Sequence, residues 1–465
     1  MNNLVEFLNN DIAYYVISGV LALCVMFGIF LMSKVEKARL GNAISAVSVL
    51  LAVIITLVKH DILGAWALYL YLAIGAIIGI IITIKLKMIE TPQLVALLNG
   101  FGGLASLIVG SYALFHIGAD ASIFGNVTAN IAMQVGMLTF VGSLIASLKL
   151  ARKINQKPVS LPHHSLILSV LLSLMAVLII ITPILSIPAW LVLILGVLLS
   201  GIFGLLFTLK IGGADMPIAI SLLNSLSGVA GAISGLAIGD ALLVSISGIV
   251  GASGLLLTQI MCKAMNRNLI DILLGKTSSK NVVQEAVKID KQAQKENRDP
   301  FEVIKSAKNV IIIPGYGMAI AQAQYVVKEL ADFLKKNGAS VKFAIHPVAG
   351  RMPGHMNVLL AEVDVDYDDL YDMETINPEF DTADVAIVIG ANDVLNPSAR
   401  DKEGTPIYGM PILNVDQSKE VFIFNFDLKP GYSGVNNSLY ERQGIHFFLG
   451  NAKDTLSAFL LELKK

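Results

Sequence analysis

Charged side chains are scarce in the first 262 residues of this chain. Only 19 of its 69 Asp, Glu, Lys and Arg residues lie between Met1 and Cys262, and the other 50 lie after Cys262. The first part is therefore about 7% charged, whereas soluble domains average about 25%. The second part has the ordinary soluble value. A protein that is soluble throughout is excluded.

Cysteines and basic runs are also scarce. The two cysteines, Cys24 and Cys262, lie in apolar stretches, which excludes a disulfide framework and a cysteine-rich metal site. The net charge is −1 and basic runs are absent, so we expect no nucleic-acid partner. No GxxxxGK[ST] motif and no metal-ligand cluster stand out, so neither a P-loop nor a metal site is expected. Glu6 and Asp11 near the N-terminus argue against a cleaved signal peptide.

Long apolar runs fill the charge-poor part. A helix needs about 20 such residues to cross about 30 Å of hydrocarbon. Nine stretches qualify, at about 12–33, 41–58, 63–84, 93–115, 123–148, 165–184, 188–209, 217–238 and 240–262. Alternate connections hold ten basic residues, whereas the other set holds only Lys59. Because basic loops stay inside, we expect the N-terminus outside and the chain after Cys262 in the cytoplasm. We expect the spans to lie in the inner or plasma membrane.

Polar side chains within these runs are few. Three groups stand out: Asn99; Asn126, Asn130 and Gln134 at helical spacing; and Ser221, Asn224, Ser225 and Ser227, which follow Asp215. Two interpretations stay open, hydrogen bonding between helices and a hydrated route for a small ion. None of these groups titrates near neutral pH, so a proton would need a partner group or water. The GxxxG pairs Gly75/Gly79 and Gly231/Gly235 indicate close helix packing.

After a polar linker at 266–300, apolar strands alternate with helices. This order predicts an α/β, Rossmann-like domain with a doubly wound parallel sheet. The expected strands are 310–313, 341–345, 385–389, 412–415, 421–424 and 446–449, and the expected helices are 318–336, 356–363 and 453–464. The predicted organisation is thus a membrane domain at 1–265, a linker at 266–300 and the α/β domain at 301–465.

The first strand leads into Gly315-Tyr316-Gly317, which has the glycine spacing of a dinucleotide-binding turn. Ile320 occupies the third glycine position, and His346 ends the second strand where an NAD site carries an acidic residue. These departures argue against an ordinary NAD site. His346 and His355 are interpreted as contacts to backbone or cofactor in preference to metal ligands. Loops rich in Gly, Asn and Pro follow at 346–355, 390–393 and 429–434, where open α/β sheets bind ligands.

Several long motifs resemble one family. PGYGMAIAQAQ, HPVAGRMPGHMNVLLAE, IGANDVLNP, PGYSGVNN, GGADMP and IMCKAMNR resemble the beta subunit of proton-translocating NAD(P) transhydrogenases. The resemblance implies nine spans and a cytoplasmic NADP(H)-binding domain. It also implies an alpha subunit that binds NAD(H), in a dimer of heteromers. Hydride then passes from NADH to NADP+ (Si-specific/Re-specific), driven by protons entering the cytoplasm.

The resemblance also implies the site residues. Asp393 couples protonation to nucleotide binding, and Asp215, Asn224 and Asn99 belong to the proton route. In this family the nucleotide lies reversed relative to an ordinary Rossmann site, with Arg351 near the phosphates. The implied nucleotide contacts are Gly315, Tyr316, Gly317, Met318, Ala319, Val348, Ala349, Gly350, Arg351, Met352, Pro353, Gly390, Ala391, Asn392, Asp393, Val394, Gly409, Met410, Lys429, Pro430, Gly431, Tyr432, Asn451 and Ala452.

The chain departs from the family pattern at two places. Asn425-Phe426 stands where family members have a Lys-Arg pair for the NADP 2′-phosphate, which leaves Lys429, with Tyr432, to meet it. Asn99 stands where many members have histidine. Either another subunit supplies the titratable group, which we favour, or water and polar side chains carry the proton. Two other functions stay open. One is a channel or transporter gated by a nucleotide-sensing domain, and the other is a structural membrane subunit with a vestigial site.

Overall fold

The computed structural model describes residues 10–465 except 33–34, 61, 63, 87–89, 117–121, 156–157, 186, 213–214, 266–267, 274–297, 351–353 and 432. The chain divides into two compact units. The first comprises Met1–Lys210 and Ala219–Thr258, and the second comprises Ile211–Ile218 and Gln259–Lys465. Each unit is considered by itself. Most of the predicted linker lies outside the described residues.

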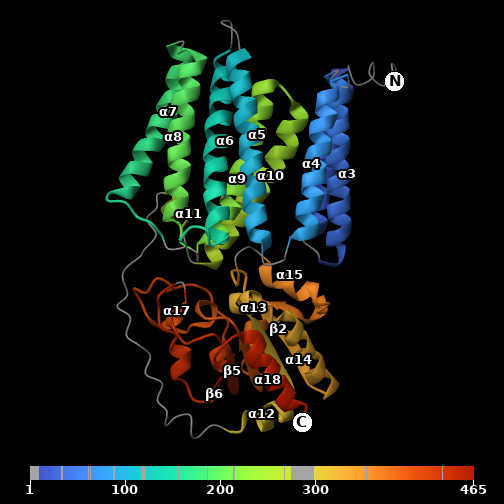
Figure 1. Cartoon of the computed structure of the whole chain (residues 1–465), viewed down its shortest axis with the longest axis vertical. Coiled ribbons are helices and arrows are strands. Elements are labelled where there is room, and N and C mark those ends of the chain that lie inside the picture. The colour runs from blue at the N-terminus through green and yellow to red at the C-terminus, as the bar shows by residue number, and fades with distance from the viewer. Residues whose placement is uncertain are drawn as a thin grey trace. The chain divides into compact units, whose positions relative to one another are not determined.

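Within the described residues, nine helices are long and apolar enough to cross a membrane (Figure 1). This confirms the nine predicted spans. They are α2 (Asp11–Met32), α3 (Val35–Lys59), α4 (Trp66–Lys85), α5 (Thr91–His116), α6 (Ile123–Leu150), α7 (His164–Ile184), α8 (Ala189–Lys210), α9 (Met216–Ile238) and α10 (Ala241–Ala264).

Glycines bring α9 and α10 into backbone contact. A Cβ on Gly228 would lie 2.4 Å from the backbone nitrogen of Gly251, and a Cβ on Gly235 would lie 2.8 Å from that of Val244. The packing interpretation therefore holds for the Gly231/Gly235 region. It does not hold within this chain for the other pair, because a Cβ on Gly75 or Gly79 in α4 meets nothing within 4 Å.

Lys149, in the last turn of α6, is fully buried. Its Nζ donates hydrogen bonds to the carbonyl oxygens of Thr208, at 3.1 Å, and Leu209, at 2.6 Å. These carbonyls belong to the last turn of α8, where backbone acceptors have no partner within the helix. Lys149 thus caps a neighbouring helix.

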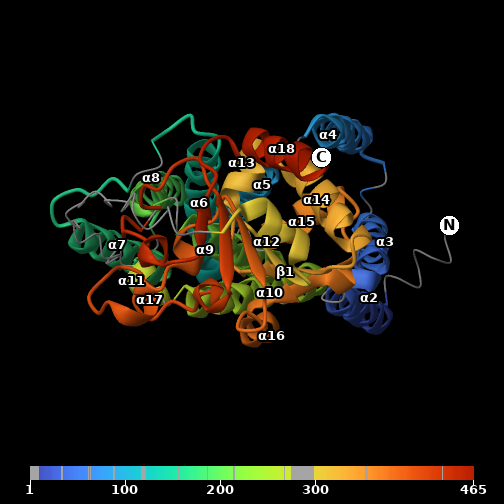
Figure 2. The ribbon, with the colours of Figure 1, turned by 90° about the horizontal axis from the view of Figure 1, so that it is seen from below.

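The second unit contains a parallel sheet of six strands in the order β3-β2-β1-β4-β5-β6. The strands are β1 (Asn309–Pro314), β2 (Ser340–Ile345), β3 (Leu370–Asp372), β4 (Val385–Ile389), β5 (Glu420–Phe424) and β6 (Ile445–Phe447). The helices are α11 (Leu269–Leu273), α12 (Pro300–Ser306), α13 (Tyr316–Ala321), α14 (Gln324–Lys336), α15 (His355–Glu362), α16 (Met373–Ile376), α17 (Ser398–Asp401) and α18 (Ala452–Leu463). In Figure 2, α14 and α18 cover one side of the strands and α16 lies on the other. The predicted doubly wound α/β fold is confirmed.

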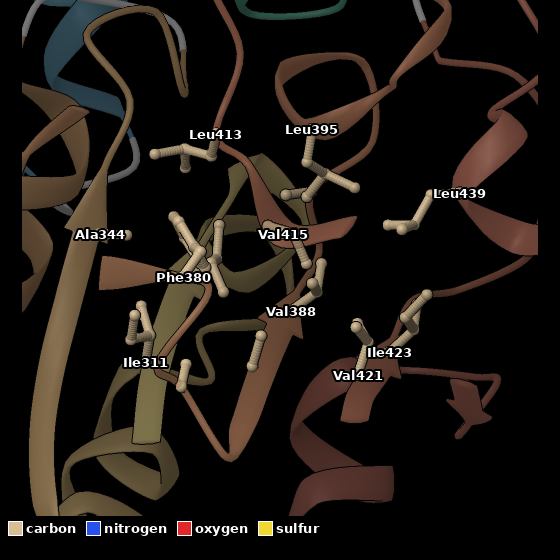
Figure 3. Packing of buried hydrophobic residues seen from close by; sticks show 14 of the residues in the cluster. Ile311, Ala344, Phe380, Val388, Leu395, Leu413, Val415, Val421, Ile423 and Leu439 are labelled. Carbon is tan, nitrogen blue, oxygen red and sulfur yellow. The ribbon is translucent and has the colours of Figure 1, made fainter. Parts of the chain in front are cut away.

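The core of this unit lies along the middle strands. All five residues of β4 are buried, as expected for a strand covered on both faces. Ile311 of β1, Val388 of β4 and Ile423 of β5 pack with Phe380 and Leu413 from connecting segments (Figure 3). This rigid core positions the loops that leave the strands.

Two predicted elements differ from the structure, and one strand of the structure was not predicted. The strand predicted at 412–415 is wrong, because this buried run joins the core from a connecting segment and ends in a 3-10 turn at Val415–Gln417. The edge strand β3 was not predicted, since only three residues form it and none is fully buried. The helix predicted at 318–336 is two helices, interrupted at Gln322, whose φ is +52°.

Candidate functional site

The turns after β1 and β4 meet at the point where the strand order reverses. β1 pairs with β2 on one side and with β4 on the other, so the connections diverge here. The Gly315 N–H donates to the carbonyl of Ile389, at 2.9 Å, and the Gly317 N–H donates to that of Gly390, at 2.8 Å. Open α/β sheets bind ligands in the crevice at such a point.

The predicted glycine turn is needed for this close approach. A Cβ on Gly315 would lie 2.3 Å from the carbonyl oxygen of Gly390. Gly390 has a φ of +68°, and its own Cβ would lie 2.3 Å from the Cα of Gly317. In an ordinary dinucleotide site, glycine amides face the pyrophosphate. Here the amides of Gly315 and Gly317 are bonded to the turn after β4, while Met318 and Ala319 of α13 are buried.

Asp393 holds the loop after β5 against the loop after β4. Its Oδ2 accepts a hydrogen bond from the Ser433 N–H at 3.0 Å, and its Oδ1 accepts one from the Ser433 hydroxyl at 2.7 Å. A Cβ on Gly431 would lie 2.6 Å from Asp393 Oδ2, so a glycine is required beside the carboxylate. The Asn392 side chain donates to the Lys429 carbonyl at 2.9 Å. The two loops predicted at 390–393 and 429–434 are thus joined by direct hydrogen bonds.

Four further polar side chains, which sequence reasoning did not select, reinforce the junction. Asn437 Nδ2 donates to Asn392 Oδ1 at 3.0 Å. Asn396 Nδ2 donates to the Asn436 carbonyl at 3.2 Å, and the buried Ser398 hydroxyl lies 3.2 Å from that of Ser438. The sequence feature that could have indicated them is the high proportion of Asn and Ser in these two loops. We call the set of residues 390–398 and 429–438 the β4–β5 junction.

His346 connects the loop after β2 to the segment before the 3-10 turn at Val415–Gln417. Its ring is buried, Nε2 donates to the Pro411 carbonyl at 2.9 Å, and Nδ1 accepts from the Val348 N–H at 3.2 Å. These bonds require the neutral Nε2–H tautomer. Burial lowers the pKa of His346 to about 4. His346 is therefore a backbone-contacting histidine, as predicted.

Two glycines shape the segments that His346 connects. Gly350 has a φ of +116°, and a Cβ there would lie 2.5 Å from His355 Nδ1. Gly409 has a φ of +76° and donates to the Ala399 carbonyl at 2.8 Å, with Met410 buried next to it. The predicted contacts Arg351, Met352 and Pro353 lie outside the described residues. Among the described residues, no group of three or more His, Cys, Asp or Glu side chains could hold a metal ion.

Asn425 provides an acceptor at the carboxyl end of β5. Its Nδ2 donates to the Ala391 carbonyl at 2.9 Å and to the Tyr440 hydroxyl at 3.1 Å. Its Oδ1 is buried and accepts no hydrogen bond from a described residue. Burial raises the pKa of Tyr440 to about 12, helped by the negative charges of Asp393 and Asp427. Neutral polar groups thus gather at the carboxyl end of β5, beside the loop after β4.

The remaining predicted contacts lie at the edge of the site. Asn451 caps α18, and its Oδ1 accepts from the Lys453 N–H at 2.9 Å. Ala452, the first residue of α18, is buried. Lys429 is 84% exposed, and its Nζ lies 3.6 Å from Asp427. Tyr432, the other residue expected near a 2′-phosphate, lies outside the described residues.

Comparison with known proteins decides the family. The family described as NAD(P) transhydrogenase beta subunit matches residues 13–462. Two curated proteins called NAD(P) transhydrogenase subunit beta, both from Rhodospirillum rubrum, are each 42% identical over 452 residues, which cover 95% of this chain and 96% of the relative. The chain belongs to this family. It is a membrane-spanning beta subunit of NAD(P) transhydrogenase, a class that uses nicotinamide nucleotides and includes an alpha subunit.

In this transhydrogenase beta subunit, two predicted proton-route residues lie at one helix interface. Asn99 of α5 donates to the Ile220 carbonyl of α9 at 3.4 Å. A Cβ on Gly102 would lie 2.3 Å from the Ser227 hydroxyl, so α5 and α9 touch again two turns along. Asn224 lies on α9 between these contacts. Asp215, in the second unit, is buried and interacts electrostatically with Cys262.

Two other predicted polar groups serve helix packing. Asn130 Nδ2 of α6 donates to the Thr182 hydroxyl of α7 at 3.1 Å. Gln134 Nε2 donates to Asn130 Oδ1 at 2.7 Å, and both residues are fully buried. Asn130 therefore bonds between helices α6 and α7, whereas Gln134 bonds to Asn130 within α6. Asn99 has the weaker contact and remains the better candidate for a proton route.

Proposed function

We propose that the loops after β1, β2, β4 and β5 bind NADP(H). In this proposal, bound NADP+ accepts hydride from NADH held by the alpha subunit, while protons enter the cytoplasm. The observation that carries it is the pair of hydrogen bonds from Ser433 to Asp393, which joins two loops beside the strand-order reversal. We further propose an N-terminus outside, a cytoplasmic α/β domain, Si-specific/Re-specific transfer and a dimer of heteromers.

The described residues fit a nicotinamide nucleotide in a reversed placement. Because Gly315 and Gly317 direct their amides to Ile389 and Gly390, these amides do not serve a pyrophosphate as in an ordinary Rossmann site. The buried acceptor Asn425 Oδ1 and the β4–β5 junction offer polar contacts on the other side of the reversal point. A bound nucleotide supplies the hydride chemistry. The protein's residues bind, orient and shield it, and no side-chain base is required.

Proton coupling is assigned to four residues. Asp393 links proton occupancy to an open or closed nucleotide site, because losing its charge would weaken its hold on the loop of Gly431 and Ser433. Asp215 acts at the membrane end of the second unit. Asn99 and Asn224 border the proton route, and a partner subunit supplies the titratable group, since amides do not titrate near neutral pH.

Purified with its alpha subunit, the chain should reduce an acetylpyridine analogue of NAD+ with NADPH. An Asp393→Asn complex should lose most of its proton-coupled turnover. Asp401→Asn is the matched control, because Asp401 is an exposed acid of α17. If no analogue is reduced while ion flux still responds to nucleotide, the chain is a nucleotide-gated channel or transporter. If nucleotide does not bind at all, the chain is a structural subunit.

Cofactor preference has its own test. We expect the chain to bind NADPH more tightly than NADH through Lys429, whose side chain is 84% exposed and would exchange its ion pair with Asp427 for the phosphate. Lys429→Ala should remove that preference, whereas Lys402→Ala, at another exposed lysine, should not. Equal affinities of the unaltered chain for the two nucleotides would overturn the NADP(H) assignment.

A further inference from the structure

Three titratable side chains meet at one end of the membrane helices. Tyr14 lies near the start of α2, His60 directly follows α3, and Asp240 directly precedes α10. The Tyr14 hydroxyl donates to Asp240 Oδ1 at 3.1 Å, and His60 Nε2 lies 3.9 Å from Asp240 Oδ2. None of these residues belongs to the nucleotide site or to the α5–α9 interface. We call them the outer cluster.

The two oxygens of Asp240 have different environments. Oδ1 accepts from the Tyr14 hydroxyl and also from the Leu243 N–H, at 2.9 Å, which makes Asp240 the N-cap of α10. Oδ2 faces His60 and accepts no hydrogen bond from a described residue. One oxygen is therefore fixed, and the other is available to receive a proton.

Burial separates Asp240 from water but not His60. The Asp240 side chain is 6% exposed, whereas the His60 side chain is 48% exposed. Tyr14 belongs to a buried hydrophobic cluster with Leu21, Ala52 and Leu242. Within the described residues, an exposed imidazole thus lies beside a buried carboxylate.

The charged groups around the outer cluster come from the same helices. On α2, Asp11 pairs with Lys59 of α3 at 3.0 Å, and Lys59 Nζ lies 5.2 Å from the Tyr14 ring centroid. On α10, the first charged residue is Lys263, at the opposite end. Asp61 lies outside the described residues. A buried carboxylate is costly unless paired, and Asp240 meets this requirement through the Tyr14 hydroxyl and the neighbouring His60 ring.

We propose that His60 and Asp240 form a proton-loading site for transhydrogenation. The protonated His60 ring transfers the proton on Nε2 to Asp240 Oδ2, which leaves a neutral ring and a neutral carboxyl group. The neutral ring then takes a proton from hydronium in the outer solution and regains its charge, so the net change is one proton moved from that solution to Asp240. Tyr14 keeps its bond to Oδ1 and orients the carboxyl group. Histidine suits this role because imidazole titrates near neutral pH.

This inference rests on the proposed proton movement. With the N-terminus outside, the ends of α2, α3 and α10 that carry the outer cluster face the side from which protons enter. The cluster supplies on this chain a titratable group that Asn99 and Asn224 lack.

The test uses the complete complex with its alpha subunit in proteoliposomes, with the pH of the outer face set independently. Asp240→Asn keeps an N-cap acceptor but cannot carry the proton, and should slow proton-coupled hydride transfer about tenfold or more. His60→Gln should slow it about tenfold at pH 8 and much less at pH 6, where water delivers protons more readily. His116→Gln is the matched control, since His116 ends α5 and, among the described residues, contacts the Tyr112 carbonyl and ring.

The outcomes distinguish a proton-loading site from a contact that only stabilises the helices. Rates of both variants within about twofold of the unaltered complex at every pH would overturn the proposal. The proposal would also be overturned if the variants turned over more slowly and had lower thermal stability, but kept the dependence on outer pH of the unaltered complex. Nucleotide binding by the variants should stay unchanged. If the unaltered complex itself shows no proton-coupled hydride transfer, the proposed function is wrong, and the proton-loading site is wrong with it.

Discussion

The Asp393 carboxylate accepts both the backbone N–H and the hydroxyl of Ser433, at 3.0 and 2.7 Å, across 40 residues of sequence. One oxygen serves each donor, so both carboxylate oxygens help to orient the loop after β5. The residue expected to couple protonation to nucleotide binding is thus already connected to a loop expected to bind it. Adding a proton to Asp393 would remove part of this connection.

Ser433→Ala should weaken nucleotide binding by the complex about tenfold. It removes one hydrogen bond to a charged acceptor, worth about 1.5 kcal/mol, while the backbone bond to Asp393 remains. Isothermal titration with NADPH measures the change. Ser306→Ala removes a hydroxyl that bonds only to the Val303 carbonyl at the surface and should leave affinity unchanged. Equal affinities of the two variants would show that the Ser433 hydroxyl does not order the site.

Gly390→Ala should destabilise the α/β domain by about 3 kcal/mol or more. The new Cβ would combine a φ of +68° with an approach of 2.3 Å to Gly317 Cα. Gly404→Ala separates the two effects, because Gly404 has a φ of +81° but open space around its Cβ. It should cost only about 1 kcal/mol. Denaturant unfolding measures both, and similar costs would contradict the close contact between the turns.

His346 should make the stability of the α/β domain depend on pH. The unfolded chain binds a proton near pH 6.5, whereas the folded one resists it until about pH 4. The contribution is therefore complete above pH 6.5 and is lost as the pH falls from 6.5 to 4, by up to about 3 kcal/mol. His346→Gln should flatten this part of the stability profile. A difference between the two proteins that stays constant from pH 4 to 7 would contradict the assignment.

Gly228→Leu should destabilise the membrane unit, because its side chain would push against the backbone of Gly251 in α10. Overpacking of this kind costs about 3 kcal/mol or more where backbone cannot move. Gly75→Leu adds the same side chain to α4, where a Cβ meets nothing within 4 Å, and should leave the melting temperature of the purified chain unchanged. Comparable losses in both variants would be inconsistent with the α9–α10 packing.

The sequence predicted most elements because long apolar runs have few stable alternatives. The nine spans and the strands β1, β2, β4 and β5 are such runs. The stretch Ile412–Val415 failed because burial in a connecting segment leaves the same apolar signature as burial in a strand. The break at Gln322 has neither glycine nor proline to mark it, so the helix pattern continues through it.

The site was predictable in outline only. Residue types and strand order placed the polar loops at the carboxyl edge of the sheet. The pairing of Asp393 with Ser433 depends on hydrogen-bond geometry between distant segments, which periodicity does not carry. Likewise, the Gly315–Gly317 spacing indicated a nucleotide-binding turn, but only the structure shows that both amides bond to the turn after β4.

The most direct test of the account follows a labelled hydride. The complex with its alpha subunit, in sealed vesicles with a pH-sensitive dye, should transfer deuterium from NADPH deuterated at the transferred position of nicotinamide C4 to the acetylpyridine analogue. The label should not exchange with water, and proton movement should accompany transfer. A reduced analogue that carries solvent hydrogen, or transfer without any pH change in the vesicles, would contradict direct, proton-coupled hydride transfer.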